Sequence, residues 1–124
     1  NFGSSDYEEA KKVSKAVAIL HRDHPEIIVD GEVQANFAMS KELLNEQFPF
    51  STLANKKTNV LIFPNLSAGN IAYKLIQEMS DTEAVGPILL GMKKPVHILQ
   101  LGCNVREIVN MVTIAVVDAQ TRKD

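Results

Sequence analysis

The sequence contains a single cysteine, no tryptophan and no long apolar run. Because Cys103 has no second cysteine to pair with, an internal disulfide is excluded, which suits a reducing cytoplasm. A membrane-spanning helix needs about 20 apolar residues, and the sequence has no such run and no signal-peptide pattern. These absences predict a cytoplasmic protein with no membrane segment.

Neither sign of charge dominates the sequence, since it has 13 basic and 15 acidic residues and a formal net charge of −2. The basic residues occur as pairs without interleaved aromatic residues, so we expect no nucleic-acid partner. With 45% hydrophobic residues, the 124 residues can bury a core, and we expect one partial domain over 1–124. The chain does not begin with methionine, which predicts that it is a piece of a longer protein.

Histidine and carboxylate side chains cluster once, where His21, Asp23, His24 and Glu26 follow one another closely. A structural zinc site combines four ligands, often with cysteine pairs. His97 is far away in the sequence and no cysteine pair exists, so we expect no metal site in this chain.

Apolar residues recur at helical spacing in some segments and form short continuous runs in others. The first helix is expected to begin at a cap on Ser5 or Asp6 and to end before Pro25. Strands that alternate with helices predict an α/β fold with a mostly parallel sheet. Further helices are expected over 41–48, over 67–79 and from 104 onward, and buried strands over 27–29, 60–63, 85–90 and 96–99.

The junction between the expected strand 60–63 and the following helix is the first candidate site. Ligands of open α/β sheets bind beyond the carboxyl ends of the strands, and a helix N-terminus there suits a phosphate. An ordinary capped helix, with Asn65 or Ser67 as the cap and Gly69 for packing, fits the same residues and is the simpler interpretation. The residues of this candidate phosphate site are Pro64, Asn65, Ser67, Ala68, Gly69 and Asn70.

A second junction, Gly102-Cys103-Asn104, carries the only thiol and is followed by Glu107. A cysteine at a helix N-terminus can have a lowered pKa, and a glutamate can act as a general base. However, Asn104 followed three residues later by Glu107 is also a capping-box pattern, and a lone cysteine usually packs as a small hydrophobic residue. The local sequence leaves both interpretations open.

Charged residues line the polar side of the first expected helix. Glu8 and Lys12 are four residues apart and can pair, whereas Lys11 and Lys15 carry the same charge. This pattern predicts a solvated face and not a binding site.

Several longer motifs follow one another in a fixed order. They are DGEVQ at 30–34, NVLIFPNLSAGNIAYK at 59–74, GPILLGM at 86–92, KPV at 94–96, IVN at 108–110 and DAQ at 118–120. Through these motifs the chain resembles the phosphate acetyl/butyryltransferase (phosphotransacetylase) family over nearly its whole length. Four details resemble the branch fused to bacterial NADP-dependent malic enzymes: QAN at 34–36, FPFS at 48–51, PVHILQ at 95–100 and VVDAQ at 116–120.

The resemblance implies a three-layer α/β/α fold, similar to isocitrate and isopropylmalate dehydrogenases, with two lobes around a cleft. This chain would supply most of the second lobe and the closing C-terminal helix. It would form homo-oligomers through that lobe and need no cofactor of its own, with acetyl-CoA as an effector. The malic enzyme part, in cis, would use NADP or NAD and a divalent metal. The implied acyl-CoA contacts are the residues of the first junction together with Gly86, Pro87, Gly102 and Cys103.

The chain departs from the family where active transacetylases have a Ser-Arg pair, because it has Gln100 and Leu101 there. Leu101 cannot donate a hydrogen bond to a phosphate, and losing such a charge-assisted contact costs about 2–4 kcal/mol, roughly two to three decades of rate. Glu107 replaces the Asp that follows in active enzymes. We therefore expect a regulatory acyl-CoA-binding module without transferase activity. Two alternatives are an active transferase, in which Glu107 and Cys103 would be catalytic, and a purely structural dimerisation module.

Overall fold

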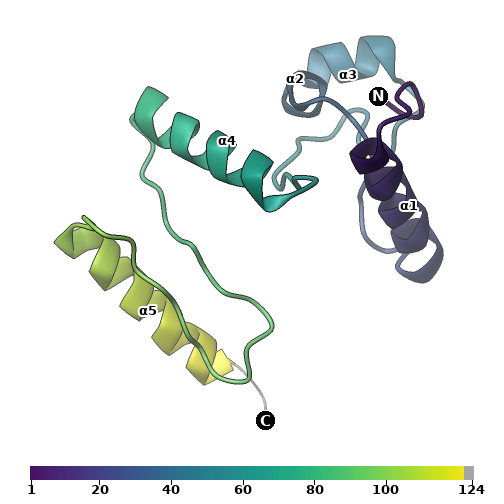
Figure 1. Ribbon diagram of the computed structural model, residues 1–124. Coiled ribbons are helices and arrows are strands. Elements are labelled where there is room, and N and C mark those ends of the chain that lie inside the picture. The colour runs from purple at the N-terminus through teal and green to yellow at the C-terminus, as the bar shows by residue number, and fades with distance from the viewer. Residues whose placement is uncertain (122–124) are drawn as a thin grey trace. The chain divides into compact units, whose positions relative to one another are not determined.

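The computed structural model describes residues 1–121, which form five α-helices joined by loops (Figure 1). The chain divides into two compact units, Asn1–Lys74 and Leu75–Asp124, and the boundary lies inside α4. Each unit is described by itself below. The helices are α1 (Glu8–Asp23), α2 (Ala35–Met39), α3 (Lys41–Gln47), α4 (Leu66–Met79) and α5 (Val105–Thr121).

Helix α1 begins and ends close to where the sequence predicts. Its N-cap is Tyr7, whose side chain makes no capping bond, so the expected cap on Ser5 or Asp6 is wrong by one or two residues. The backbone N–H of Tyr7 instead lies 3.4 Å from Ser5 Oγ. At the other end, the N–H of His24 bonds to the carbonyl of Leu20, and the proline that follows ends the helix.

In the first unit, the short helices α2 and α3 pack against each other, and the buried apolar side chains are Val17 of α1, Ala38 of α2 and Leu44 of α3. Ser40 caps α3 by accepting a hydrogen bond from the N–H of Leu43, which confirms the helix expected over 41–48. Leu44 in α3 is the most deeply buried side chain of the described residues, with 2% exposure. Four aromatic rings with centroid separations of 5.0–6.0 Å extend this apolar cluster; they belong to Phe2, Phe37, Phe48 and Phe50.

The second unit consists of the end of α4, a long loop and α5. Met111 on α5 is its buried apolar residue among those described. Helices were expected over 67–79 and from 104, and both are confirmed to within one residue. Many apolar side chains of α5 nevertheless remain exposed; they include Val105, Val109, Val112, Val116 and Val117.

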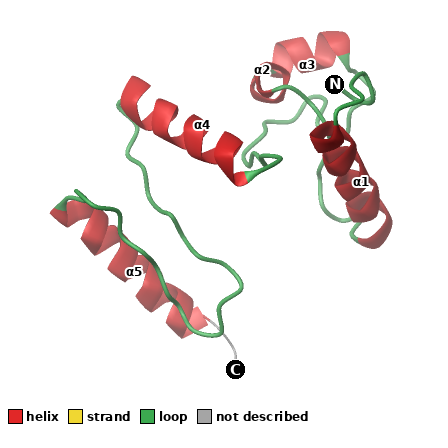
Figure 2. Cartoon of the chain, in the orientation of Figure 1, coloured by secondary structure: helices red, strands yellow, loops and turns green. Residues whose placement is uncertain are grey.

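The four expected strands are wrong as local structure, because no strand is drawn for the described part of the chain (Figure 2). Within it, the one β-type pairing is an isolated antiparallel bridge between Ile88 and His97, which belong to the third and fourth expected strands. An apolar run becomes a strand only when neighbouring strands bond to its backbone N–H and C=O groups. The run 60–63 has no such neighbour among residues 1–121, and Ile62 is 80% exposed.

No helix within residues 1–121 combines the length and the apolarity needed to cross a membrane. Over the same residues, no three His, Cys, Asp or Glu side chains come together in a group that could hold a metal ion. His21 and His24, the nearest approach to a ligand pair, bind Val29 and Glu26 instead, at 2.8 and 3.2 Å.

Candidate functional site

The first junction is a capped helix start, as the simpler interpretation predicts. The side-chain oxygen of Asn65 accepts a hydrogen bond from the N–H of Ala68 at 2.9 Å, and the Asn65 carbonyl accepts from the N–H of Gly69 at 3.2 Å. Asn65 is therefore the cap and Ser67 is not. The cap satisfies part of the helix start and leaves the positive end of the α4 dipole facing the turn.

Gly69 in the first turn of α4 lies against the ring of Phe63. A Cβ atom at this glycine would lie 3.6 Å from Phe63 Cβ and 3.7 Å from Phe63 Cγ. These are ordinary van der Waals distances, so Gly69 brings the helix close to Phe63 without being sterically required there. The packing role expected for Gly69 is confirmed.

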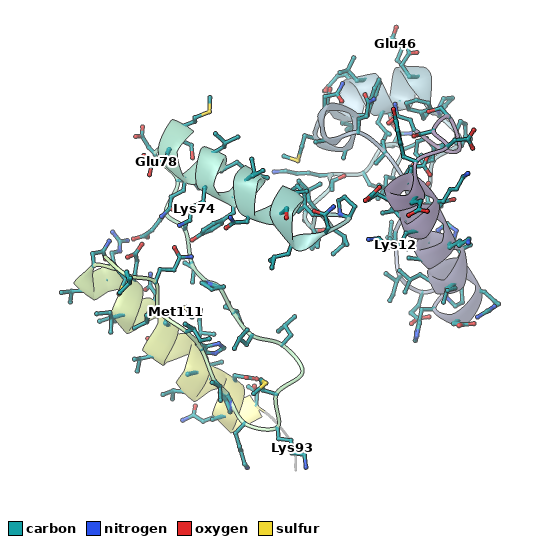
Figure 3. All side chains as sticks on the ribbon, viewed as in Figure 1. Lys12, Glu46, Lys74, Glu78, Lys93 and Met111 are labelled. Atoms are coloured by element: carbon teal, nitrogen blue, oxygen red, sulfur yellow. The ribbon has the colours of Figure 1, made fainter. Side chains whose placement is uncertain are left out.

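Lys12 of α1 is a residue of this junction that the sequence analysis missed (Figure 3). Its ammonium donates a hydrogen bond to the backbone carbonyl of Pro64 at 2.6 Å, across 52 residues of sequence. The expected pairing of Lys12 with Glu8 on a solvated face does not describe this contact. No periodicity could have revealed it, because it depends on how α1 packs within the first unit.

The position of Lys12 conflicts with the dipole of α4. Cations are favoured near the C-terminus of a helix and disfavoured near its N-terminus, yet this ammonium lies on the carbonyl directly before Asn65 and Leu66. The hydrogen bond to Pro64 offsets part of the repulsion. The ammonium of Lys12 and the N-terminal end of α4 thus both place positive charge at this turn.

The capping box predicted at the second junction is formed. Asn104 and Glu107 exchange hydrogen bonds: the N–H of Asn104 donates to Glu107 Oε2 at 2.7 Å, and the N–H of Glu107 donates to Asn104 Oδ1 at 2.9 Å. This pair accounts for the Glu107 carboxylate as the cap of α5. Cys103 carries a half-buried free thiol. Its backbone N–H donates a hydrogen bond to the Gln100 carbonyl at 3.3 Å.

Three other features of the second unit bear on the expected site. Gly102 has a φ of +85°, a left-handed conformation that a glycine adopts without strain. Arg106 Nε lies 2.8 Å from Glu83 Oε1, so the segment just before Gly86 and Pro87 is tied to the first turn of α5. Leu101 projects into solvent and is fully exposed.

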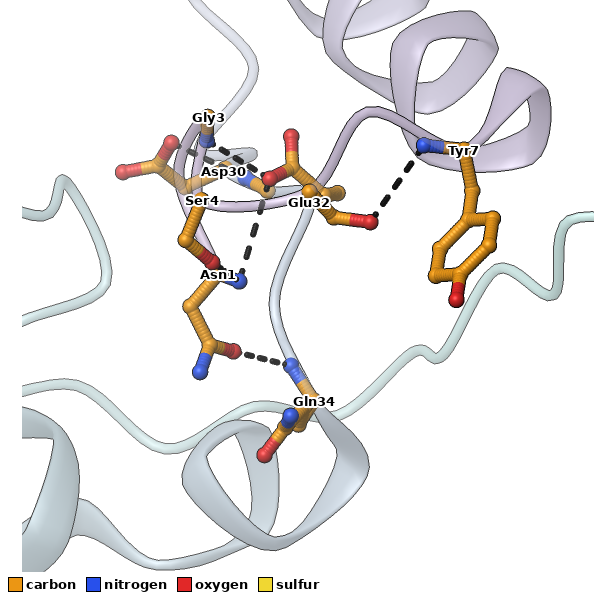
Figure 4. Close-up of polar contacts among 9 residues, drawn as sticks. Asn1, Gly3, Ser4, Tyr7, Asp30, Glu32 and Gln34 are labelled. Carbon is orange, nitrogen blue, oxygen red and sulfur yellow. Dashed lines mark hydrogen bonds and ion pairs between the residues drawn. The ribbon is translucent and has the colours of Figure 1, made fainter.

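The DGEVQ segment is held by polar contacts within the first unit. The N–H of Gly3 donates to Glu32 Oε1 at 2.7 Å, and the N–H of Gln34 donates to Asn1 Oδ1 at 2.6 Å (Figure 4). Asp30 binds the following loop, because its Oδ2 accepts from Ser51 Oγ and from the N–H of Thr52, both at 2.8 Å. The two carboxylates of this motif therefore hold the N-terminal residues and the loop at 51–52 against it.

An open depression lies in the first unit, where the last turn of α1 meets the loops around Ile27 and Thr52. His21 Nε2 is 2.8 Å from the Val29 carbonyl, and Lys56 Nζ donates to the Thr52 carbonyl at 2.7 Å. Its polar groups are thus engaged with the backbone, and it coincides with none of the expected site residues. The depression is lined by His21, Pro25, Ile27, Ile28, Thr52 and Lys56.

The expected site residues therefore lie in two places. Pro64 to Asn70 form one turn in the first unit, together with Lys12, while Gly86, Pro87, Gly102 and Cys103 belong to the second unit. At these two junctions the helix starts are capped by Asn65 and by the Asn104–Glu107 pair.

Both junctions are capped helix starts, and each lies in or next to a motif by which the sequence resembles a known family. Residues 1–116 match the family described as phosphate acetyl/butaryl transferase. The chain belongs to this family, which fits an α/β class.

Individual relatives fall into two groups. The chain is 41% identical to the NADP-dependent malic enzyme of Escherichia coli over 98% of its own length and 16% of the enzyme. It is 42% identical to the phosphate acetyltransferase of Clostridium acetobutylicum over 95% of its length and 35% of that protein. An NAD-dependent malic enzyme of Rhizobium meliloti is 43% identical over 96% of the chain and 15% of the enzyme. The chain thus spans a minor part of each of these relatives.

Proposed function

We propose that the chain is the phosphotransacetylase-like part of a malic enzyme and serves as an acetyl-CoA-binding regulatory and oligomerisation module without transferase activity. In this proposal a malic enzyme part in cis oxidises and decarboxylates malate to pyruvate with NADP or NAD and a divalent metal. The identity to malic enzymes over nearly the whole chain supports this context. The cofactor preference is left open, since relatives of both kinds match equally well.

The observation that carries the loss of catalysis is Leu101. It occupies the position of the arginine that holds the anionic substrate in active transacetylases, and its apolar side chain cannot replace a charged donor. Gln100 stands where the serine of that pair would be. The Glu107 carboxylate is engaged as the α5 cap, which leaves it poorly placed as a general base. We expect about two to three decades of rate to be lost from the Arg position alone.

Support for the retained half of the activity, the binding of a phosphate-bearing ligand, comes from the start of α4. Lys12 adds a positive charge to a helix N-terminus that already attracts anions. Small side chains at Ser67, Ala68 and Gly69 let a ligand approach the backbone. We assign the phosphates of acetyl-CoA to this turn, with Gly86, Pro87, Gly102 and Cys103 as further contacts of the ligand.

The proposed architecture is a three-layer α/β/α fold similar to isocitrate and isopropylmalate dehydrogenases. The chain would be a single partial domain, most of the second lobe and the closing helix. The exposed apolar residues of 60–63 and of α5 support this proposal, because such surfaces need cover from a neighbouring layer or a second copy. A cytoplasmic homo-oligomer follows from it.

The proposal is tested on the complete gene product in two assays. We expect no measurable acetyl exchange between acetyl phosphate and CoA, whereas malate oxidation should respond to acetyl-CoA. The Gln100→Ser/Leu101→Arg double variant is the matched variant, because it restores the family's residues and should raise exchange. Exchange at the rate of a free phosphate acetyltransferase in the unmodified protein would overturn the proposal.

An active phosphate acetyl- or butyryltransferase, which moves an acyl group between CoA and phosphate, is the second candidate. It is favoured by the 42% identity to phosphate acetyltransferases, as high as the identity to malic enzymes. In that case Glu107 and Cys103 would act in catalysis, and Glu107→Gln should abolish exchange. Under our proposal the same variant has no exchange activity to lose.

A further inference from the structure

We draw no further inference here: the strongest candidate, the surface patch that the exposed side chains of Val105, Val109, Val112 and Val116 form on α5, carries no proposal, because nothing within residues 1–121 shows what covers it.

Discussion

Replacing Asp30 by alanine should destabilise the first unit more than its partial burial suggests. Its Oδ2 accepts hydrogen bonds from Ser51 Oγ and from the N–H of Thr52, and its Oδ1 accepts from the N–H of Gly31 at 2.9 Å. Ser51 is only 5% exposed, so its hydroxyl would lose its acceptor where water reaches poorly. A buried polar group left without a partner costs about 1–3 kcal/mol.

The two remaining donors are backbone N–H groups, and that of Thr52 is exposed enough for water to replace the carboxylate in part. Allowing for this, we expect Asp30→Ala to lower the free energy of unfolding by about 2–3 kcal/mol. Urea unfolding of the complete gene product, followed with exchange at Thr52 and Leu53, measures the effect. Leu53 is included because its N–H bonds to Ser51 Oγ.

Asp6→Ala provides the matched control for this prediction. Asp6 is an aspartate whose partner is Lys11 Nζ, and its side chain is fully exposed, so its removal should leave the unfolding free energy nearly unchanged. A loss below about 0.5 kcal/mol in Asp30→Ala, equal to that of the control, would refute the view that this carboxylate holds the loop 51–54.

Three further perturbations follow from particular contacts. Asn104→Ala removes the acceptor for the N–H of Glu107 and should cost about 1 kcal/mol of helix stability, seen as faster exchange in the first turn of α5; an unchanged rate contradicts the capping box. His97→Leu should raise the unfolding free energy by about 1 kcal/mol, because both ring nitrogens are buried without a hydrogen-bond partner within the described residues; a large loss would mean that the imidazole has a polar partner. Hydrogen bonding to Arg22 lowers the pKa of Asp23, so Arg22→Gln should raise that pKa in a carbon-detected NMR titration. An unchanged pKa would show that Arg22 is not the cause of the lowered value. Since the folded-state pKa is lowered, the stabilising contribution of this pair is present above the ordinary carboxyl pKa and is lost as the pH falls through the lowered value.

Helix boundaries were predictable because their determinants are local. The proline after His24 and the pairing of Asn104 with Glu107 each act within one turn, and each appears as a pattern in the sequence. The short helix α2 was missed because its five residues carry no cap signal: Gln34 is the N-cap and makes no side-chain bond.

Strands could not be predicted in the same way, because a strand is completed by residues that are distant in sequence. The run 60–63 has the apolar, branched composition of a buried strand, but among residues 1–121 nothing pairs with it. The apolar composition of a segment indicates that it should be buried, but it does not show whether strands that could pair with it are present. Within residues 1–121, the Ile88–His97 bridge is the one place where two expected strands meet.

The candidate site shows the same division between local and distant information. Asn65 and Gly69 were identified from the sequence, and their cap and packing roles are confirmed. Lys12 was assigned to a solvated face, although it binds the Pro64 carbonyl. The difference is physical: a cap depends on residues three positions away, whereas the Lys12 contact depends on the packing of α1.

We propose that the chain binds acetyl-CoA without transferring its acyl group, and calorimetric titration of the complete gene product with acetyl-CoA measures this binding. We predict saturable binding that weakens with added salt, because phosphates are held by positive potential at the start of α4, and weaker binding in Lys12→Met than in Lys11→Met. Absence of any saturable heat from acetyl-CoA would contradict the claim and leave a structural module.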